Sequence, residues 1–117
     1  MDYVFYNKNG DPIAYSSGID IFLFSGKPVA YFHDDAIYSY SGKQLGWFDS
    51  GWVIDLQGYS VFFTDSATGG LVKPIKRVNP IRSVRGIVPV KGIREVKKIK
   101  PVKRMSWSSY SGTNFFL

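Results

Sequence analysis

The sequence predicts an all-β fold, in which four β-hairpin repeats in a pseudo-fourfold arrangement are followed by a long, extended C-terminal arm. Two observations carry this prediction: a glycine-centred motif recurs every sixteen residues in the first half of the chain, and an apolar residue recurs at every third position after it. We divide the chain into a four-hairpin repeat domain (1–66), a glycine-containing junction (67–71), a basic and apolar arm of period three (72–105) and a Ser-rich C-terminal segment (106–117).

The hairpins follow from self-similarity. Segments aligned on the glycines read YNKNGDPIAYS, FLFSGKPVAYF, YSYSGKQLGWF and IDLQGYSVFFT, with an aliphatic residue three positions after each glycine and an aromatic residue five positions after it. Alternation of period two on either side of a glycine is typical of a β-hairpin, and the glycine supplies the positive φ angle of the turn. We therefore predict structural turns at Gly10, Gly26, Gly42 and Gly58.

The four hairpins are expected to associate, because a single hairpin cannot bury its apolar face alone. Small residues at equivalent positions (Ala14, Ala30 and Gly46) would let neighbouring units pack closely, and Phe62 at the fourth position would fill space near the pseudo-axis. The glycine turns should lie at one end of this domain. The links between hairpins should lie at the other end and form an acidic rim, because they hold most of the acidic residues.

The arm carries an apolar residue at every third position without exception. An α-helix is excluded, because a period of three drifts around the helix axis and four prolines interrupt the segment. Polyproline II, which has three residues per turn, would place all these side chains on one face, and we favour it. A β-strand, the alternative, would point the Val and Ile residues to opposite sides. The arm residues predicted to pack are Val72, Ile75, Val78, Ile81, Val84, Ile87, Val90, Ile93, Val96, Ile99, Val102 and Met105.

The length of the arm restricts where it can go. As polyproline II, residues 72–105 would span about 105 Å, whereas a compact 100-residue domain has a radius of gyration of only about 13 Å. The arm must therefore wrap, fold back or reach another subunit. We expect its apolar side chains to be buried there, because one buried Val or Ile contributes more than one exposed ion pair. Serine at Val84, Ile87 and Val90 should then unfold the protein, whereas removal of three nearby cations should not.

Charge is divided sharply between the two halves of the chain. Residues 1–71 carry −5 and residues 72–105 carry +11, within a total of +6. This asymmetry favours docking of the arm on the acidic rim of its own chain or of another copy. Nucleic-acid binding by the arm is the alternative, although the arm has no aromatic residue on which bases could stack. Its possible phosphate contacts are Arg82, Arg85, Lys91, Arg94, Lys97 and Lys100.

Residues that support catalysis or metal binding are few. The chain has no cysteine, and its single histidine, His33, stands beside Asp34 and Asp35 in a segment interpreted as a solvated turn. The Ser-rich stretch 106–112 has no histidine–acid pair placed around it. We expect neither enzymatic activity nor a cofactor or metal. The start of the chain does not resemble a signal peptide and no apolar run is long enough to span a membrane, so we expect a cytoplasmic location.

The chain resembles the four-fold beta-flower domain family, which comprises small bacterial proteins of unknown function. The resemblance is carried by the four glycine-centred repeats, the junction FFTDSATGGLVKPIKRV, the repeated (V/I)-K-x tract and the ending RMSWS. It implies a fold of four β-hairpin petals, and it transfers no catalytic or binding residue.

The function predicted from these observations is that of a non-enzymatic scaffold or protein-interaction module that self-associates through the apolar arm. Its expected partner is a second copy, giving a homo-oligomer, or another protein. Nucleic acid remains the alternative partner.

Overall fold

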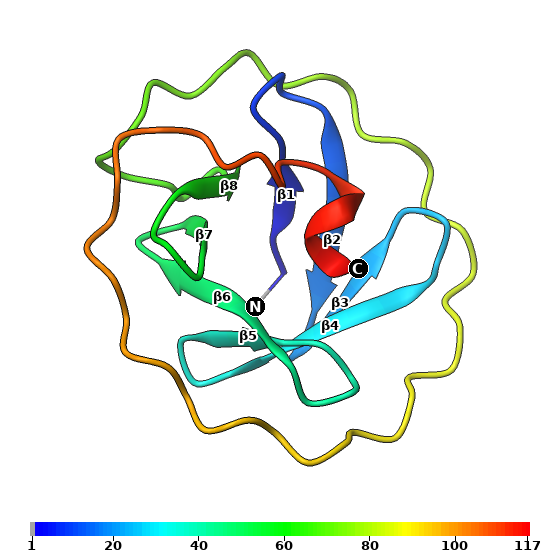
Figure 1. Cartoon of the computed structure of the whole chain (residues 1–117). Coiled ribbons are helices and arrows are strands. Elements are labelled where there is room, and N and C mark those ends of the chain that lie inside the picture. Colours follow the sequence, from blue (N-terminus) through cyan, green and yellow to red (C-terminus); the bar gives the residue numbers. More distant parts are fainter. Residues whose placement is uncertain (1) are drawn as a thin grey trace.

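Eight short strands form a closed antiparallel barrel in which each strand pairs with its neighbours in sequence (Figure 1). The computed structural model describes residues 2–117. The strands are β1 (Val4–Tyr6), β2 (Pro12–Ser17), β3 (Asp20–Leu23), β4 (Pro28–His33), β5 (Ala36–Tyr38), β6 (Gln44–Asp49), β7 (Trp52–Asp55) and β8 (Ser60–Phe63), and a 3₁₀ helix, η1, spans Thr113–Phe116. A pairing of β1 with β8 closes the barrel. The prediction of an all-β fold with four hairpins is confirmed.

The hairpins β1–β2, β3–β4, β5–β6 and β7–β8 repeat one hydrogen-bond pattern. The N–H group of each turn glycine donates to the carbonyl three residues earlier, over 2.9 to 3.1 Å. The four glycines have φ angles between 81° and 99°. Each hairpin also has a register shift at the same point, where one residue of the second strand (Ile13, Val29, Leu45 or Val61) has no partner, and a bulge of this kind bends a strand and increases its twist. The bent hairpins extend outwards towards the arm (Figure 1).

The interior of the barrel is filled by two sets of side chains. One set comes from the first strand of each hairpin, namely Phe5, Ile21, Ile37 and Val53. The other comes from the second strands, where three positions are small and the fourth is Phe62. The Phe62 ring contacts Phe5, and it also meets Phe115 and Phe116 of η1 at centroid distances of 5.7 and 5.8 Å. The space between Phe62 and η1 has no room for a water molecule, so this part of the barrel is a packed core.

A second aromatic layer covers the outer wall of the barrel. The aromatic residues five positions after the glycines (Tyr15, Tyr31, Trp47 and Phe63) are all buried, although they point away from the interior. They pair with aromatic residues of the neighbouring strands, as Tyr15 does with Phe22. This layer needs a cover, because a barrel wall faces solvent unless another segment packs on it.

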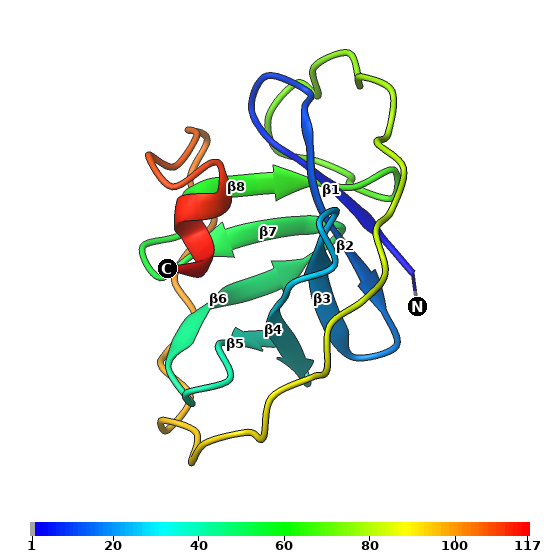
Figure 2. The ribbon, with the colours of Figure 1, turned by 90° about the vertical axis from the view of Figure 1, so that its right-hand side faces the viewer.

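The arm supplies that cover by encircling the barrel once (Figures 1 and 2). No helix or strand is present in residues 72–105. The molecule measures 36 × 36 × 23 Å, and a circle of 36 Å diameter has a circumference of about 113 Å. That length agrees with the span of about 105 Å expected for the arm as polyproline II. The arm was expected to wrap, fold back or reach another subunit, and in the structure it wraps around its own hairpins.

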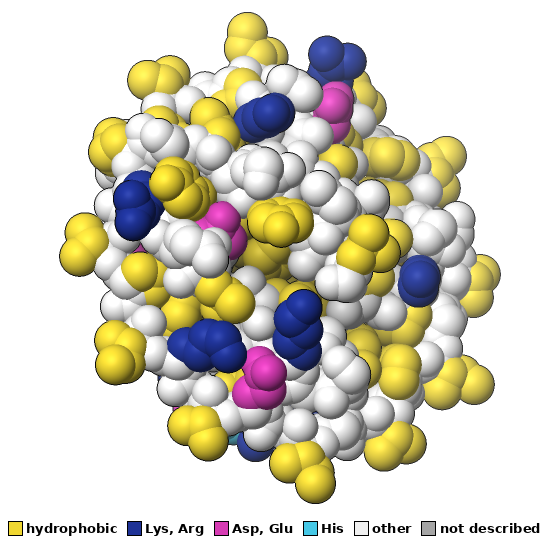
Figure 3. All heavy atoms as spheres, in the orientation of Figure 1, with side chains coloured by type: hydrophobic (Ala, Val, Ile, Leu, Met, Phe, Trp, Pro, Cys, Tyr) yellow, Lys and Arg dark blue, Asp and Glu magenta, His cyan; other side chains and the backbone are white. Residues whose placement is uncertain are grey.

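The expected burial of the arm's apolar side chains is wrong within this chain. The eleven Val and Ile residues of the predicted packing set, Val72 to Val102, are 87–96% exposed, and Met105 is 64% exposed. They project from the rim of the molecule (Figure 3). The physical reason is that backbone carbonyl groups and Lys or Arg side chains occupy the inner sides of the arm. The Val and the Ile residues are exposed alike, and the arm forms no strand that would point them to opposite sides.

Candidate protein-interaction surface

Four equivalent backbone clamps hold the arm to the barrel. In each clamp an arm N–H group donates to the carbonyl oxygen of a turn glycine, over 2.8 to 2.9 Å. The N–H group of Arg77 donates to Gly10, that of Gly86 to Gly26, that of Glu95 to Gly42 and that of Arg104 to Gly58. The donors are nine residues apart and the acceptors sixteen. Nine residues of arm therefore correspond to one hairpin, and the pseudo-fourfold symmetry of the barrel extends to the arm.

The arm also explains why the turns must be glycine. A Cβ atom on Gly26 would lie closer than 3.0 Å to the carbonyl oxygen of Val84, and the other three turn glycines meet an arm carbonyl in the same way. Backbone atoms can give way only if the arm moves. Each turn glycine thus provides a positive φ angle and a surface on which the arm backbone rests.

Two columns of cations on the inner side of the arm repeat every nine residues. They are Lys73, Arg82, Lys91 and Lys100 in one column and Lys76, Arg85, Arg94 and Lys103 in the other. Sequence reasoning missed this repeat, because the period of three among the apolar residues hides it. Dividing the arm into four units, one for each hairpin, would have revealed it.

Most of these cations lie against the aromatic outer layer. The Arg82 guanidinium is 3.9 Å from the centroid of the Tyr15 ring, and the Lys91 ammonium is 4.9 Å from that of Tyr31. In the other column, Arg85 lies over Phe22 and also donates to the Tyr15 hydroxyl. A cation over an aromatic face is attracted by the ring quadrupole, and its aliphatic stem covers apolar surface. The basic residues therefore do the packing that was expected of the aliphatic ones.

Other cations reach the acidic links between the hairpins. Lys97 lies 3.1 Å from Asp35 and 3.5 Å from Asp34, and Lys100 lies 3.5 Å from Asp49. Partial burial acts to raise the pKa of Asp35, but the hydrogen bond and charge of Lys97 outweigh it and leave that pKa below its usual value. The same hydrogen bond raises the pKa of Lys97. The arm therefore meets acidic residues of its own chain, as the charge asymmetry predicted.

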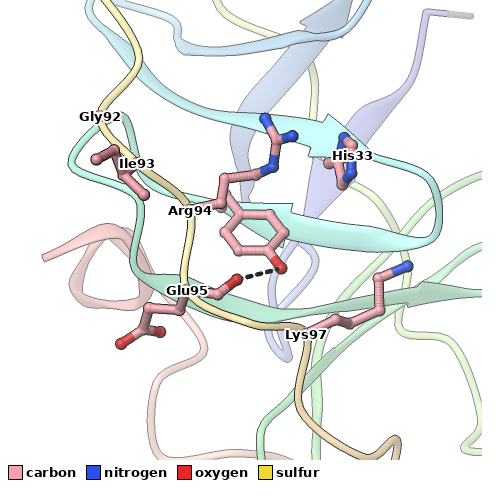
Figure 4. A pocket seen from close by; sticks show the side chains of 7 residues that line it. His33, Gly92, Ile93, Arg94, Glu95 and Lys97 are labelled. Atoms are coloured by element: carbon pink, nitrogen blue, oxygen red, sulfur yellow. Dashed lines mark hydrogen bonds between the residues drawn. The ribbon is translucent and has the colours of Figure 1, made fainter.

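The one acidic residue of the arm, Glu95, joins it to the third hairpin. Its carboxylate accepts the backbone N–H of Gln44 over 2.8 Å, and this hydrogen bond lowers the pKa of Glu95. The Tyr38 hydroxyl donates to the Glu95 carbonyl (Figure 4). Beside this junction, His33 and Arg94 help to line an open hollow of about 450 Å³. Its lining residues hold the arm in place, and they bring no nucleophile and base together.

The six residues considered for phosphate contacts are spread around the barrel. Arg82, Arg85 and Lys91 lie on aromatic rings, Lys97 and Lys100 pair with carboxylates, and Arg94 borders the hollow. Five of the six are thus already engaged within the chain. Their positions do not form one continuous basic face.

The other residues considered for catalysis or metal binding lie where they stabilise the fold. His33 lies 3.8 Å from Asp34. The buried Ser108 hydroxyl donates to the Asp55 carboxylate over 2.7 Å, which fixes the C-terminal segment against β7. Within residues 2–117, no group of three or more His, Cys, Asp or Glu side chains is placed to hold a metal ion. In the same residues, no helix has the length and apolar character needed to cross a membrane.

What the structure leaves uncovered is a rim of aliphatic side chains, which we term the apolar belt. It consists of the twelve residues from Val72 to Met105 that recur every third position. The belt has four arcs: Ile75, Val78 and Ile81; Val84, Ile87 and Val90; Ile93, Val96 and Ile99; and Val102 and Met105 with Val72. Soluble monomers rarely expose large apolar surfaces, which makes the belt a candidate interaction surface.

Comparison with known proteins assigns the chain to one family. A family model described as "4-fold beta flower protein" matches residues 3–116. No curated protein and no solved structure matches the chain. The family match includes the hairpins, the arm and the C-terminal segment, and thus the whole apolar belt.

Proposed function

We propose, from the premise that this chain belongs to the 4-fold beta flower protein family, that it is a non-enzymatic interaction module which binds further copies of itself through the apolar belt. The observation that carries the proposal is the exposure of all twelve belt side chains on one rim. Aliphatic groups in water favour association, because burial removes their apolar surface from solvent.

The belt is suited to binding because its backbone is held in place. The clamps at the four turns and the cations over the aromatic layer fix the arm before any partner arrives. A preorganised surface loses little conformational entropy on binding. An arm that merely needed to cover the barrel would gain nothing from aliphatic residues on its outer side, where Lys, Glu or Ser would be more soluble.

Size-exclusion chromatography with light scattering tests the proposal. The wild-type chain should show a mass that rises with concentration. A belt variant with serine at the middle of each arc (Val78, Ile87, Val96 and Met105) should remain a monomer at the same concentrations. Ile19 is an exposed apolar residue outside the belt, so Ile19→Ser is the matched control and should associate like the wild type. A wild-type chain that stays monomeric at every concentration would contradict the proposal.

Nucleic-acid binding is the second candidate, and the net charge of the arm is the observation in its favour. The inward placement of the cations counts against it. Fluorescence anisotropy with short duplex and single-stranded probes separates the two functions. Binding at about 50 mM salt that falls steeply by about 200 mM would support this candidate, whereas no binding at the lower salt would remove it.

A further inference from the structure

We infer that self-association through the belt is open and lateral: each molecule offers four equivalent edges, and copies join side by side into a planar array without closing as a dimer. This inference rests on the proposed function, because it takes a second copy of the chain as the occupant of the belt. It adds the valency and the geometry of that association.

The equivalence of the four edges comes from the way the arm closes on itself. One unit of nine residues separates Val72, at the start of the arm, from Ile81 in the first arc, so the two have the same phase. The Lys103 side chain, near the end of the arm, extends to Gly70, just before the arm begins. Each hairpin is therefore faced by one arc with three apolar side chains. The first and third arcs have the same residues, Ile, Val and Ile, and the second has Val, Ile and Val, so a partner surface that fits one arc meets similar side chains on the next.

The shape of the molecule directs these edges sideways. The molecule measures 36 × 36 × 23 Å, the arm encircles it (Figure 1), and hydrophobic side chains project around its outline (Figure 3). A second copy that covers one arc leaves the other three in water. A contact between opposite arcs of neighbouring copies adds copies in a row without a closing rotation, and heterologous contacts of that kind extend indefinitely.

A single edge is too small to hold a stable dimer. Specific interfaces bury roughly 800 Å² on each partner and use about 20–30 residues a side. One arc presents three apolar side chains and the surface immediately around them. Each edge contact should therefore be weak, and stable assembly should require several edges of each molecule at once.

The arc has a geometry that another arc can match. Three residues of polyproline II rise about 9.3 Å, so successive side chains of an arc leave gaps into which the side chains of a second arc fit. Several cations of the arm lie over aromatic rings or beside carboxylates, as Arg82, Lys91, Lys97 and Lys100 do, so two rims can approach without placing these charges face to face. A net charge of +6 on each copy still opposes association at low salt.

Sedimentation velocity and light scattering of the full chain test the inference. The weight-average mass should keep rising with concentration beyond that of four chains, and it should rise further from about 50 mM to about 500 mM salt because the net charges are screened. Two variants complete the design: serine at all three positions of the second arc (Val84, Ile87 and Val90), and serine at all three of the third. Each should lower the mean mass by a similar factor and leave assembly in place, because three edges remain.

The possible outcomes separate this inference from the function on which it rests. A mass that saturates at two chains, with one arc variant monomeric and the other unchanged, would mean a closed dimer through one arc; the inference fails and the proposed self-association stands. A monomer under all conditions removes both. The shape of the wild-type curve alone distinguishes open from closed assembly, so the test holds even if a variant folds poorly.

Discussion

At the turn glycines, a single residue type meets two requirements of different origin. The first, a positive φ angle, is visible in the sequence because NG, SG and QG lie between alternating apolar residues. The second, the close approach of an arm carbonyl to the glycine, joins residues between 44 (Gly58 and Val102) and 65 (Gly10 and Ile75) positions apart and has no local signal. Sequence reasoning therefore found the right glycines and only half of the reason for them.

Alanine at Gly26 tests the second requirement. Gly26 has a φ angle of 94° and lies against the Val84 carbonyl, whereas Gly18 has a φ angle of 61° and no atom within 4 Å of its would-be Cβ. We expect Gly26→Ala to lower the free energy of unfolding by about 2–5 kcal/mol, from backbone strain and overpacking together. Gly18→Ala should cost about 1–2 kcal/mol, from strain alone. Urea denaturation measures both, and equal losses would show that the arm does not press on the turn.

Glu95 gives the docked arm a dependence on pH. Its pKa in the folded protein is lowered by the hydrogen bond from the Gln44 N–H, so the stabilisation is present above the unfolded pKa of about 4.5 and is lost as the pH falls through the folded value. Glu95→Gln should therefore lower the melting temperature at about pH 7 and have little effect at about pH 3. Melting curves of both proteins across this range measure the difference. Asp2→Asn, at an exposed carboxylate, is the control, and an equally pH-dependent effect there would contradict the assignment.

At the scale of elements, the hairpins were predictable and the orientation of the arm was not. Each hairpin repeats the same residue types at the same spacing, so one interpretation applied four times. The arm's period of three predicted an apolar stripe and its length predicted a wrap, but neither indicates which way the stripe faces. The predicted orientation rested on the stabilisation from a buried Val or Ile being larger than that from an exposed ion pair. It did not include the stabilisation from cations that lie on aromatic rings, such as Arg82 on Tyr15. That omission reversed the predicted orientation.

The structure therefore reverses the expected effects of two triple substitutions. Glutamine at Arg82, Arg85 and Lys91 removes three cations from the aromatic layer, each worth about 0.5–2 kcal/mol, and should lower the melting temperature by roughly 5–15 °C. Serine at all three positions of the second arc should change the free energy of unfolding by less than about 0.5 kcal/mol per site, because these side chains are exposed.

Thermal melts at low protein concentration, where the chain is a monomer, measure both variants. Circular dichroism before heating verifies that each variant is folded. A serine variant that unfolds while the glutamine variant stays native would restore the original expectation of a buried stripe.

At the scale of the whole molecule, barrel and arm complete each other. The barrel has an aromatic outer wall that needs a cover, and the arm has no helix or strand of its own to define its course. The four turns give the arm its path, and the arm encloses the wall. The sequence indicated this interdependence through its charge asymmetry, with −5 in the first 71 residues and +11 in the arm. It did not indicate that the apolar side of the arm would face away from the barrel.

The position of the arm after the hairpins has a consequence for synthesis on the ribosome. The hairpins emerge first, and residues 72–105 must still be translated before the circle can close. At about 5–20 residues per second this takes roughly 2–7 s, during which the aromatic wall of the nascent barrel faces solvent without its cover. For those seconds the new chain is open to capture by chaperones or by the arm of a finished neighbour, and a pause in translation within the arm would lengthen that exposure.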